Sequence, residues 1–85
     1  MRRVVTVVSK EGCHLCEALL EALSGLVPRY DIEVRVLDIA QDSALHDRYW
    51  LTVPVVQIDG RDVFDAGDMR PGADYSSRLE SLLKL

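Results

Sequence analysis

The feature that most constrains this sequence is a pair of cysteines, Cys13 and Cys16, placed where the residue pattern changes from strand to helix. Before the pair, residues 4–8 form a run of mostly valine without alternation, which is typical of a strand buried on both faces of a sheet. After it, apolar residues recur at the spacing of a helix that faces a core, namely Cys16, Leu19, Leu20, Leu23 and Val27. The pattern therefore predicts a central strand followed by a helix, with the cysteines at their junction.

A second strand is expected after this helix. Ser24, Gly25 and Pro28 are expected to end the helix. Apolar and charged side chains then alternate from residue 32 to 36, and the strand runs on to residue 38, half buried. A right-handed crossover makes the two strands parallel, with the helix on one face of the sheet.

The second half of the chain predicts a short helix, a hairpin and a last helix. Asp42 is a suitable N-cap for a helix over residues 44–49. Asp59-Gly60 favours a tight type I′ turn, so residues 55–58 and 61–64 should pair antiparallel. An irregular connection over residues 65–73 leads to a helix with apolar positions at Tyr75, Leu79, Leu82 and Leu83. The expected order is β-α-β-α-β-β-α, an α/β fold.

Length and charge narrow the class of protein. We expect the 85 residues, numbered 1–85, to form a single domain, because a second core has no room. The net charge of -4 and scattered basic residues argue against nucleic-acid binding. No run approaches the roughly 20 apolar residues of a membrane helix, and the apolar run at residues 4–8 is too short for a signal peptide. We therefore expect a soluble, cytoplasmic protein, a monomer without nucleic-acid or membrane partners.

The position of the two cysteines indicates redox chemistry. A disulfide between two cysteines only three positions apart would enclose too short a loop to stabilise the fold much. At a helix N-terminus, free N–H groups and the helix dipole favour the thiolate of Cys13, which is the attacking species. Cys16, one turn later, shares the core-facing stripe of the helix. We therefore predict that Cys13 is an exposed nucleophile and Cys16 a buried resolving thiol.

Two other interpretations of the pair stay open. Both cysteines would serve as small core residues at helical spacing. Alternatively they would hold a metal, although tetrahedral zinc needs four ligands and only His14 and His46 are available as soft companions. A metal or iron-sulfur cluster completed across a dimer would satisfy this requirement, and the protein would then be a carrier.

Three segments together resemble the glutaredoxin-like branch of the thioredoxin superfamily: residues 9–16, Thr52-Val53-Pro54 and the Asp59-Gly60 hairpin. The Cys-His-Leu-Cys motif is most similar to small bacterial glutaredoxin-like proteins. The resemblance implies a thioredoxin-like fold with a four-stranded mixed sheet and three helices. It also implies a thiol-disulfide oxidoreductase with Cys13 and Cys16 as catalytic residues and no metal or organic cofactor. Its partners would be a disulfide-containing protein or small molecule, and a reductase or glutathione as electron donor.

The resemblance also assigns roles around the cysteines. It implies that Val53-Pro54 is a cis peptide beside them and that Thr52, Val53 and Pro54 bind substrate, with the backbone of Val53 pairing with an extended chain. A trans proline that starts an edge strand is the alternative. Lys10 matches a lysine that favours the thiolate or contacts a glutathione carboxylate, or else it is a solvated loop residue.

Gly12 and His14 flank the nucleophile and are expected to tune it. For His14, the alternative is an exposed residue without a role.

At the position of the Gly-Gly and acidic pair that bind glutathione in this family, the chain has residues 64–68. Only Gly67 and Asp68 can be matched to these glutathione-binding residues, so the match is incomplete. A glutathione-dependent glutaredoxin is therefore kept as the alternative to an enzyme reduced by a reductase protein. Tyr49 and Trp50 would contact a partner protein or close the core, and they are left outside the site.

Overall fold

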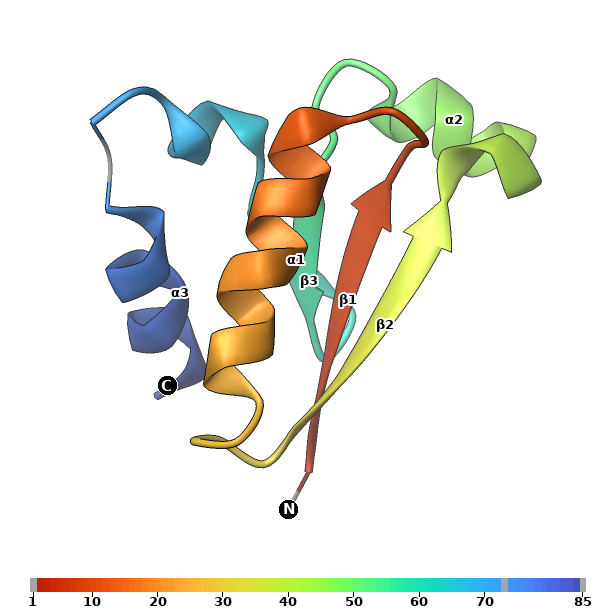
Figure 1. Cartoon of the computed structure of the whole chain (residues 1–85). Coiled ribbons are helices and arrows are strands. Elements are labelled where there is room, and N and C mark those ends of the chain that lie inside the picture. Colours follow the sequence, from red (N-terminus) through yellow and green to blue (C-terminus); the bar gives the residue numbers. More distant parts are fainter. Residues whose placement is uncertain (1, 73, 85) are drawn as a thin grey trace.

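Four strands form one mixed sheet in a computed structural model that describes residues 2–72 and 74–84 (Figure 1). The strands are β1 (Arg3–Ser9), β2 (Ile32–Asp38), β3 (Val55–Ile58) and β4 (Arg61–Phe64), in the spatial order β2-β1-β3-β4. β2 is parallel to β1, and the other two pairs are antiparallel. The central position predicted for the first strand is confirmed, since β1 has a neighbour on both sides.

Three helices accompany the sheet: α1 (His14–Leu26), α2 (Ser43–Tyr49) and α3 (Tyr75–Leu83). Figure 1 shows α1 and α3 side by side, while α2 lies beyond the C-terminal ends of β1 and β2. Val7 packs with Leu19 of α1 and Leu79 of α3, and the next residue, Val8, packs with Tyr49 of α2. Successive side chains of a strand point to opposite faces. α1 and α3 therefore cover one face of the sheet, and α2 covers the other face only near Val8, in the predicted thioredoxin-like α/β fold. The predicted burial of β1 on both faces is wrong for Val4 and Thr6, which are half-buried because none of the described helices lies over them.

The core divides into two clusters. The main core lies between the sheet, α1 and α3, and contains Val5, Val7, Leu19, Leu23, Leu26, Ile32, Val56, Ile58, Phe64, Met69, Leu79 and Leu83. A smaller group, here called the cysteine cluster, contains Val8, Cys13, Cys16, Ile39, Tyr49, Val53 and Val55. The cysteines thus lie in a separate apolar environment at one end of the sheet.

The end of α1 differs from the prediction. Ser24 and Gly25 lie within the helix, and Ser24 Oγ donates a hydrogen bond to the carbonyl of Glu21 at 2.7 Å, so its polar group is satisfied without ending the helix. Leu26 is buried in place of Val27, which is 42% exposed. A spacing of three or four residues continues through Leu23 to Leu26, whereas Val27 caps the helix and points away from the core.

The C-terminal half of β2 is more exposed than its alternation predicted. Ile32 is buried, but Val36 and Leu37 are 52% and 40% exposed. β2 is an edge strand with β1 as its only neighbour in the sheet. Its side chains therefore lack the contacts that a second neighbouring strand would provide, and they stay more exposed.

The hairpin at Asp59-Gly60 is confirmed. Both residues have positive φ, 51° and 86°, as a type I′ turn requires. Asp59 also ties the turn to β1, because its carboxylate accepts from the N–H of Val4 at 3.2 Å and its own N–H donates to the carbonyl of Val4 at 3.0 Å. A bulge between Val56 and Gln57 shifts the register of β3 and β4.

Two short 3-10 helices were not predicted, at Ile39–Gln41 and Ala66–Met69. The second lies inside the connection expected to be irregular, whose last residue, Ala73, falls outside the described residues. Asp42 caps α2 as predicted, since its carboxylate accepts from the N–H groups of Ala44 and Leu45. Within residues 2–72 and 74–84, no helix is long and apolar enough to cross a membrane.

Candidate functional site

Cys13 and Cys16 form a disulfide at the start of α1, with their Cα atoms 5.2 Å apart. Cys13 is the N-cap of this helix, and its sulfur accepts a hydrogen bond from the N–H of Cys16 at 3.2 Å. Gly12 precedes it with φ of +74°, a conformation that L side chains rarely adopt. The chain therefore needs glycine here to turn from β1 into α1 with the sulfur directed at the free N–H groups of the first turn.

The exposure predicted for Cys13 is wrong. Cys13 is only 9% exposed and Cys16 only 3%, so both are buried, although Cys13 is the more accessible. Both belong to the cysteine cluster, in which Tyr49 of α2 and Val53 pack close to them. Helical periodicity describes one face of α1, but the cover over Cys13 comes from elements more than thirty residues later in the sequence.

The segment before β3 lies against the disulfide. Val53-Pro54 is a cis peptide, as the resemblance implied, and both residues are buried. The N–H of Val53 donates to the carbonyl of Tyr49 at 3.0 Å, and the carbonyl of Thr52 accepts from the N–H of Ala66 at 3.2 Å. Because the N–H of Val53 is already bonded within the chain, backbone pairing with an extended substrate is limited to its carbonyl group.

The flanking residues Lys10 and His14 lie at the surface. Lys10 directly follows the last residue of β1, in the loop that leads to the cysteine pair. The side chain of His14 is 99% exposed, and its Nδ1 lies 4.0 Å from Oε2 of Glu17, one turn along the helix. His14 is thus placed in solvent beside a carboxylate.

Gly67 and Asp68 lie in the second 3-10 helix and have partners of their own. The N–H of Gly67 donates to Oδ1 of Asp65 at 2.8 Å. Oδ2 of Asp68 accepts from the N–H of Asp65 at 3.0 Å, and Oδ1 pairs with Arg78 at 3.7 Å. The polar groups expected to grip glutathione are engaged in capping this short helix.

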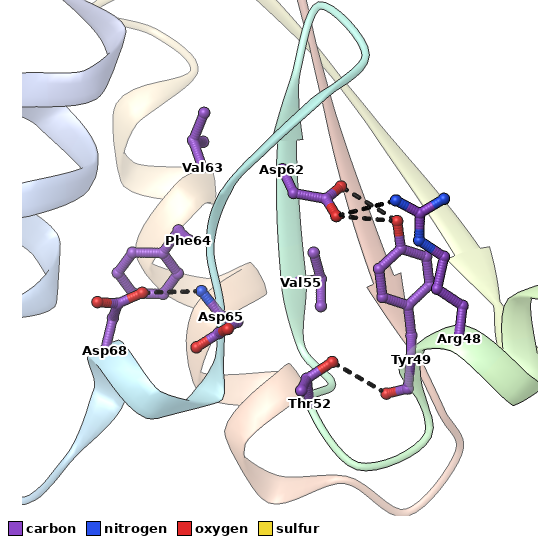
Figure 2. Close-up of a pocket in the computed structure, with 9 residues that line it drawn as sticks. All are labelled: Arg48, Tyr49, Thr52, Val55, Asp62, Val63, Phe64, Asp65 and Asp68. Carbon is purple, nitrogen blue, oxygen red and sulfur yellow. Dashed lines mark hydrogen bonds and ion pairs between the residues drawn. The ribbon is translucent and has the colours of Figure 1, made fainter.

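A cleft of about 400 Å³ lies beside the cysteine cluster (Figure 2). Its lining consists of Arg48, Tyr49, Thr52, Val55, Asp62, Val63, Phe64, Asp65 and Asp68. Tyr49 and Val55 belong to both the cleft and the cysteine cluster. Of the predicted site residues, Thr52 and Asp68 line the cleft, while the cysteines, Val53 and Pro54 are not part of its lining.

Tyr49 is the residue of this region that sequence reasoning set aside. It is 6% exposed, whereas the adjacent Trp50 is 50% exposed. The hydroxyl of Tyr49 donates to the carboxylate of Asp62, and Nε2 of Gln57 donates to the same hydroxyl at 3.2 Å. Its position four residues before Val53 was the one sign in the sequence that Tyr49 lies near the site. Its hydrogen-bond partners, Gln57 and Asp62, could not be inferred because they lie on the hairpin, further along the chain.

In residues 2–72 and 74–84, no group of three or more histidine, cysteine, aspartate or glutamate side chains is arranged to hold a metal ion.

Comparison with known proteins agrees with this geometry. Residues 4–83 match a family described as glutaredoxin-like domain (DUF836). A solution NMR structure of protein Ne2328 from Nitrosomonas europaea is 26% identical, with a TM-score of 0.74 over 95% of this chain and 91% of that chain. A mutant thioredoxin from Halobacterium salinarum, 22% identical, has a TM-score of 0.68 over 96% of this chain and 72% of that one.

Another structural match is the oxidised form of mitochondrial thioredoxin 3 from Saccharomyces cerevisiae. It is 19% identical, with a TM-score of 0.66 over 96% of this chain and 76% of that chain. These two thioredoxins show the fold of the chain. No curated protein matches the sequence significantly.

Proposed function

This chain belongs to the glutaredoxin-like domain family, and we propose that it is a thiol-disulfide oxidoreductase that works through Cys13 and Cys16. The observation that carries the proposal is the disulfide at the N-terminus of α1, with Val53, the first residue of the cis peptide Val53-Pro54, in the same cluster. The disulfide is the oxidised state of the proposed cycle. We expect this chemistry in a reducing compartment such as the cytoplasm, where thiols are regenerated.

The cycle begins with the reduced protein. The thiolate of Cys13 attacks one sulfur of a substrate disulfide, forming a mixed disulfide and releasing the other substrate sulfur as a thiolate that takes up a proton. The thiol of Cys16 then loses its proton and attacks the sulfur of Cys13. The mixed disulfide breaks, the second substrate thiol leaves, and two electrons have passed from the protein to the substrate. An external thiol donor reduces the Cys13–Cys16 disulfide and closes the cycle.

The local geometry supports these roles for the two cysteines. The sulfur of Cys13 is the N-cap acceptor of α1 and receives the N–H of Cys16. Such a donor and the positive end of the helix dipole stabilise a thiolate more than a thiol. Cys16 is deeper in the cluster and lies within bonding distance, as a resolving thiol requires.

A protein disulfide is the substrate class that the surface around the site favours. Leu15, within the cysteine motif, and Leu51, directly before Thr52, are 43% and 74% exposed. Trp50 is half exposed beside Leu51. Exposed apolar side chains at the rim of a site contribute contact area to a protein partner. The groups matched to glutathione binding, Gly67 and Asp68, are bonded within the chain, so we propose a reductase protein as the electron donor.

The test uses single substitutions of the two cysteines in an assay of insulin disulfide reduction. Cys13→Ala should abolish turnover, because no attacking thiolate remains. Cys16→Ser should accumulate a mixed disulfide on Cys13, visible by mass spectrometry, because the resolving step is removed. Full reductase activity of Cys13→Ala would overturn the proposal. Turnover with glutathione and a small mixed disulfide as the sole substrates would instead assign a glutathione-dependent enzyme.

A further inference from the structure

We propose that Tyr49 is a positioning residue that holds the segment Thr52-Val53-Pro54 against the disulfide and thereby sets the affinity for substrate. The inference rests on the proposed function for its kinetic consequence. Its structural part, the fixing of this segment by one side chain, is measured without any turnover.

The carbonyl of Tyr49 is the anchor of the segment. It accepts the N–H of Thr52 at 2.9 Å, the N–H of Val53 at 3.0 Å and the hydroxyl of Thr52 at 3.3 Å. Figure 2 shows the last of these bonds at the lower edge of the cleft. The two backbone N–H groups that directly precede Pro54 therefore depend on where one carbonyl group lies.

The hydroxyl of Tyr49 is held by the hairpin. It lies 3.1 and 3.0 Å from the two carboxylate oxygens of Asp62 on β4. Gln57 on β3 donates to this hydroxyl and, at 2.9 Å, to Asp62. The guanidinium of Arg48 lies 5.3 Å from the centre of the Tyr49 ring and 4.0 Å from Asp62. The hydroxyl thus has partners on both strands of the hairpin.

Between these two ends, the ring of Tyr49 packs in the cysteine cluster. Tyr49 is therefore bonded to the sheet through its hydroxyl and to the segment Thr52-Val53-Pro54 through its carbonyl. Cys13 and Cys16 belong to the same cluster as its ring. Replacing the hydroxyl with hydrogen removes the fixed point on the sheet and leaves Asp62 and Gln57 without their shared partner. The N-cap of α1, which governs the thiolate of Cys13, does not involve Tyr49. The substitution should consequently weaken substrate binding and leave the chemical step intact.

The chain offers a matched control in Tyr30. Its hydroxyl donates to Oε1 of Glu80 on α3 at 2.6 Å, so it makes the same tyrosine–carboxylate bond in the main part of the fold. Tyr30 packs against the main core rather than the cysteine cluster. Tyr30→Phe therefore measures what the loss of such a bond does to the protein in general.

The experiment compares Tyr49→Phe with Tyr30→Phe in two readouts. In the oxidised protein, hydrogen exchange of the Thr52 and Val53 amides should accelerate about fivefold or more in Tyr49→Phe, the effect of one hydrogen bond, while amides of β1 are unchanged. In insulin reduction, Tyr49→Phe should raise KM by a similar factor with kcat within about twofold. Tyr30→Phe should change neither the Thr52 and Val53 amides nor KM.

Asp62→Ala supplies the second variant. It should reproduce the exchange and KM changes of Tyr49→Phe, although it also removes the contacts of Asp62 with Gln57 and Arg48. The double variant should be no worse than Asp62→Ala alone, because that variant has already lost the Tyr49–Asp62 bond. Unchanged exchange at Thr52 and Val53 in Tyr49→Phe, or equal changes in Tyr30→Phe, would overturn the inference. Faster exchange in a protein whose Cys13→Ala variant keeps full activity would uphold the positioning of the segment while refuting the proposed function.

Discussion

The backbone N–H of Cys16 lies 3.2 Å from the sulfur of Cys13, so the second cysteine of the motif supplies a hydrogen bond to the first. The bond exists because Cys13 is the N-cap of α1 and Cys16 occupies the third position of the helix. A sulfur in this place is stabilised most when it carries negative charge. The two cysteines should therefore differ in reactivity, although both are largely buried.

The first prediction concerns alkylation of the reduced protein. Cys13 should react with iodoacetamide about tenfold faster than Cys16 near pH 7, because it is more accessible and its thiolate is stabilised. Peptide mass spectrometry after short exposures measures the two rates. In concentrated urea the difference should disappear, and faster labelling of Cys16 in the folded protein would reverse the roles assigned here.

The second prediction concerns the redox equilibrium of the pair. In glutathione buffers, alkylation and mass shift should reveal a reversible two-electron transition between the dithiol and the Cys13–Cys16 disulfide. A midpoint of about -270 mV would fit a thioredoxin-like reductant, and one of about -200 to -230 mV would fit glutaredoxin-like use. If no intramolecular disulfide formed at any poise, the dithiol mechanism would be wrong, and metal content after anaerobic purification would test the carrier alternative.

The third prediction concerns Gly12, whose φ of +74° joins β1 to the cysteine motif. A Cβ at this position meets no atom within 4 Å, so Gly12→Ala should destabilise the protein by backbone strain alone, by about 1 to 2 kcal/mol. Gly25 lies within α1, where a Cβ is also unobstructed. Gly25→Ala should stabilise the fold by about 0.5 to 1 kcal/mol. Urea unfolding measures both changes, and equal signs for the two variants would contradict this assignment.

The fourth prediction concerns pH and the Tyr30–Glu80 bond. The hydrogen bond from Tyr30 lowers the pKa of Glu80 below its ordinary value of 4.5, and the same bond raises the pKa of Tyr30 above 10.0. The Glu80 contribution is present above pH 4.5 and is lost as pH falls through the folded-state pKa. The Tyr30 contribution is present below pH 10.0 and is lost as pH rises through its raised value.

Tyr30→Phe removes the Tyr30 contribution and the part of the Glu80 contribution that this bond supplies, while the ion pair of Glu80 with Arg29 remains. The difference in unfolding free energy between the natural protein and Tyr30→Phe should be largest near neutral pH and should shrink in acid and in strong base. Urea unfolding across the pH range measures it. A difference that stays constant down to about pH 3 would show that the bond is not the cause.

The fifth prediction concerns the apolar rim of the site. Leu51→Ser and Leu15→Ser should raise KM for insulin severalfold, because each removes apolar contact area with a protein partner. Reduction of a small aromatic disulfide should change little. Val36→Ser, on the exposed edge of β2, serves as the control and should leave both activities unaltered. An equal effect of all three variants on KM would remove the argument for a protein substrate.

Local patterns were sufficient for most of the secondary structure. The valine run of β1, the Asp42 cap of α2 and the Asp59-Gly60 turn each depend on neighbours in sequence, so their structures follow from backbone preferences and side-chain period. The cis peptide at Val53-Pro54 was expected only through the family resemblance. Local sequence alone does not distinguish a cis from a trans proline reliably.

Where the prediction failed, long-range packing was responsible. Ser24 and Gly25 remain helical because α1 continues to pack through Leu26 into the main core, and packing outweighs weak helix propensity. Val36 and Leu37 are exposed because β2 lies at the edge of the sheet. Neither the extent of a helix under tertiary contact nor the order of strands is encoded in a short window of residues.

The sequence by itself determined the order of elements and the place of the two cysteines at the start of a helix, because these follow from residue spacing and local backbone preferences. Only the tertiary structure decided that Cys13 is covered, that Val53 donates its N–H to Tyr49, and that the Tyr49 hydroxyl is bound by Asp62. Each of these depends on contacts between segments that come together when α2 and the hairpin pack on the sheet. Burial and hydrogen bonding across such distances are properties of the packed chain, so no local pattern reports them.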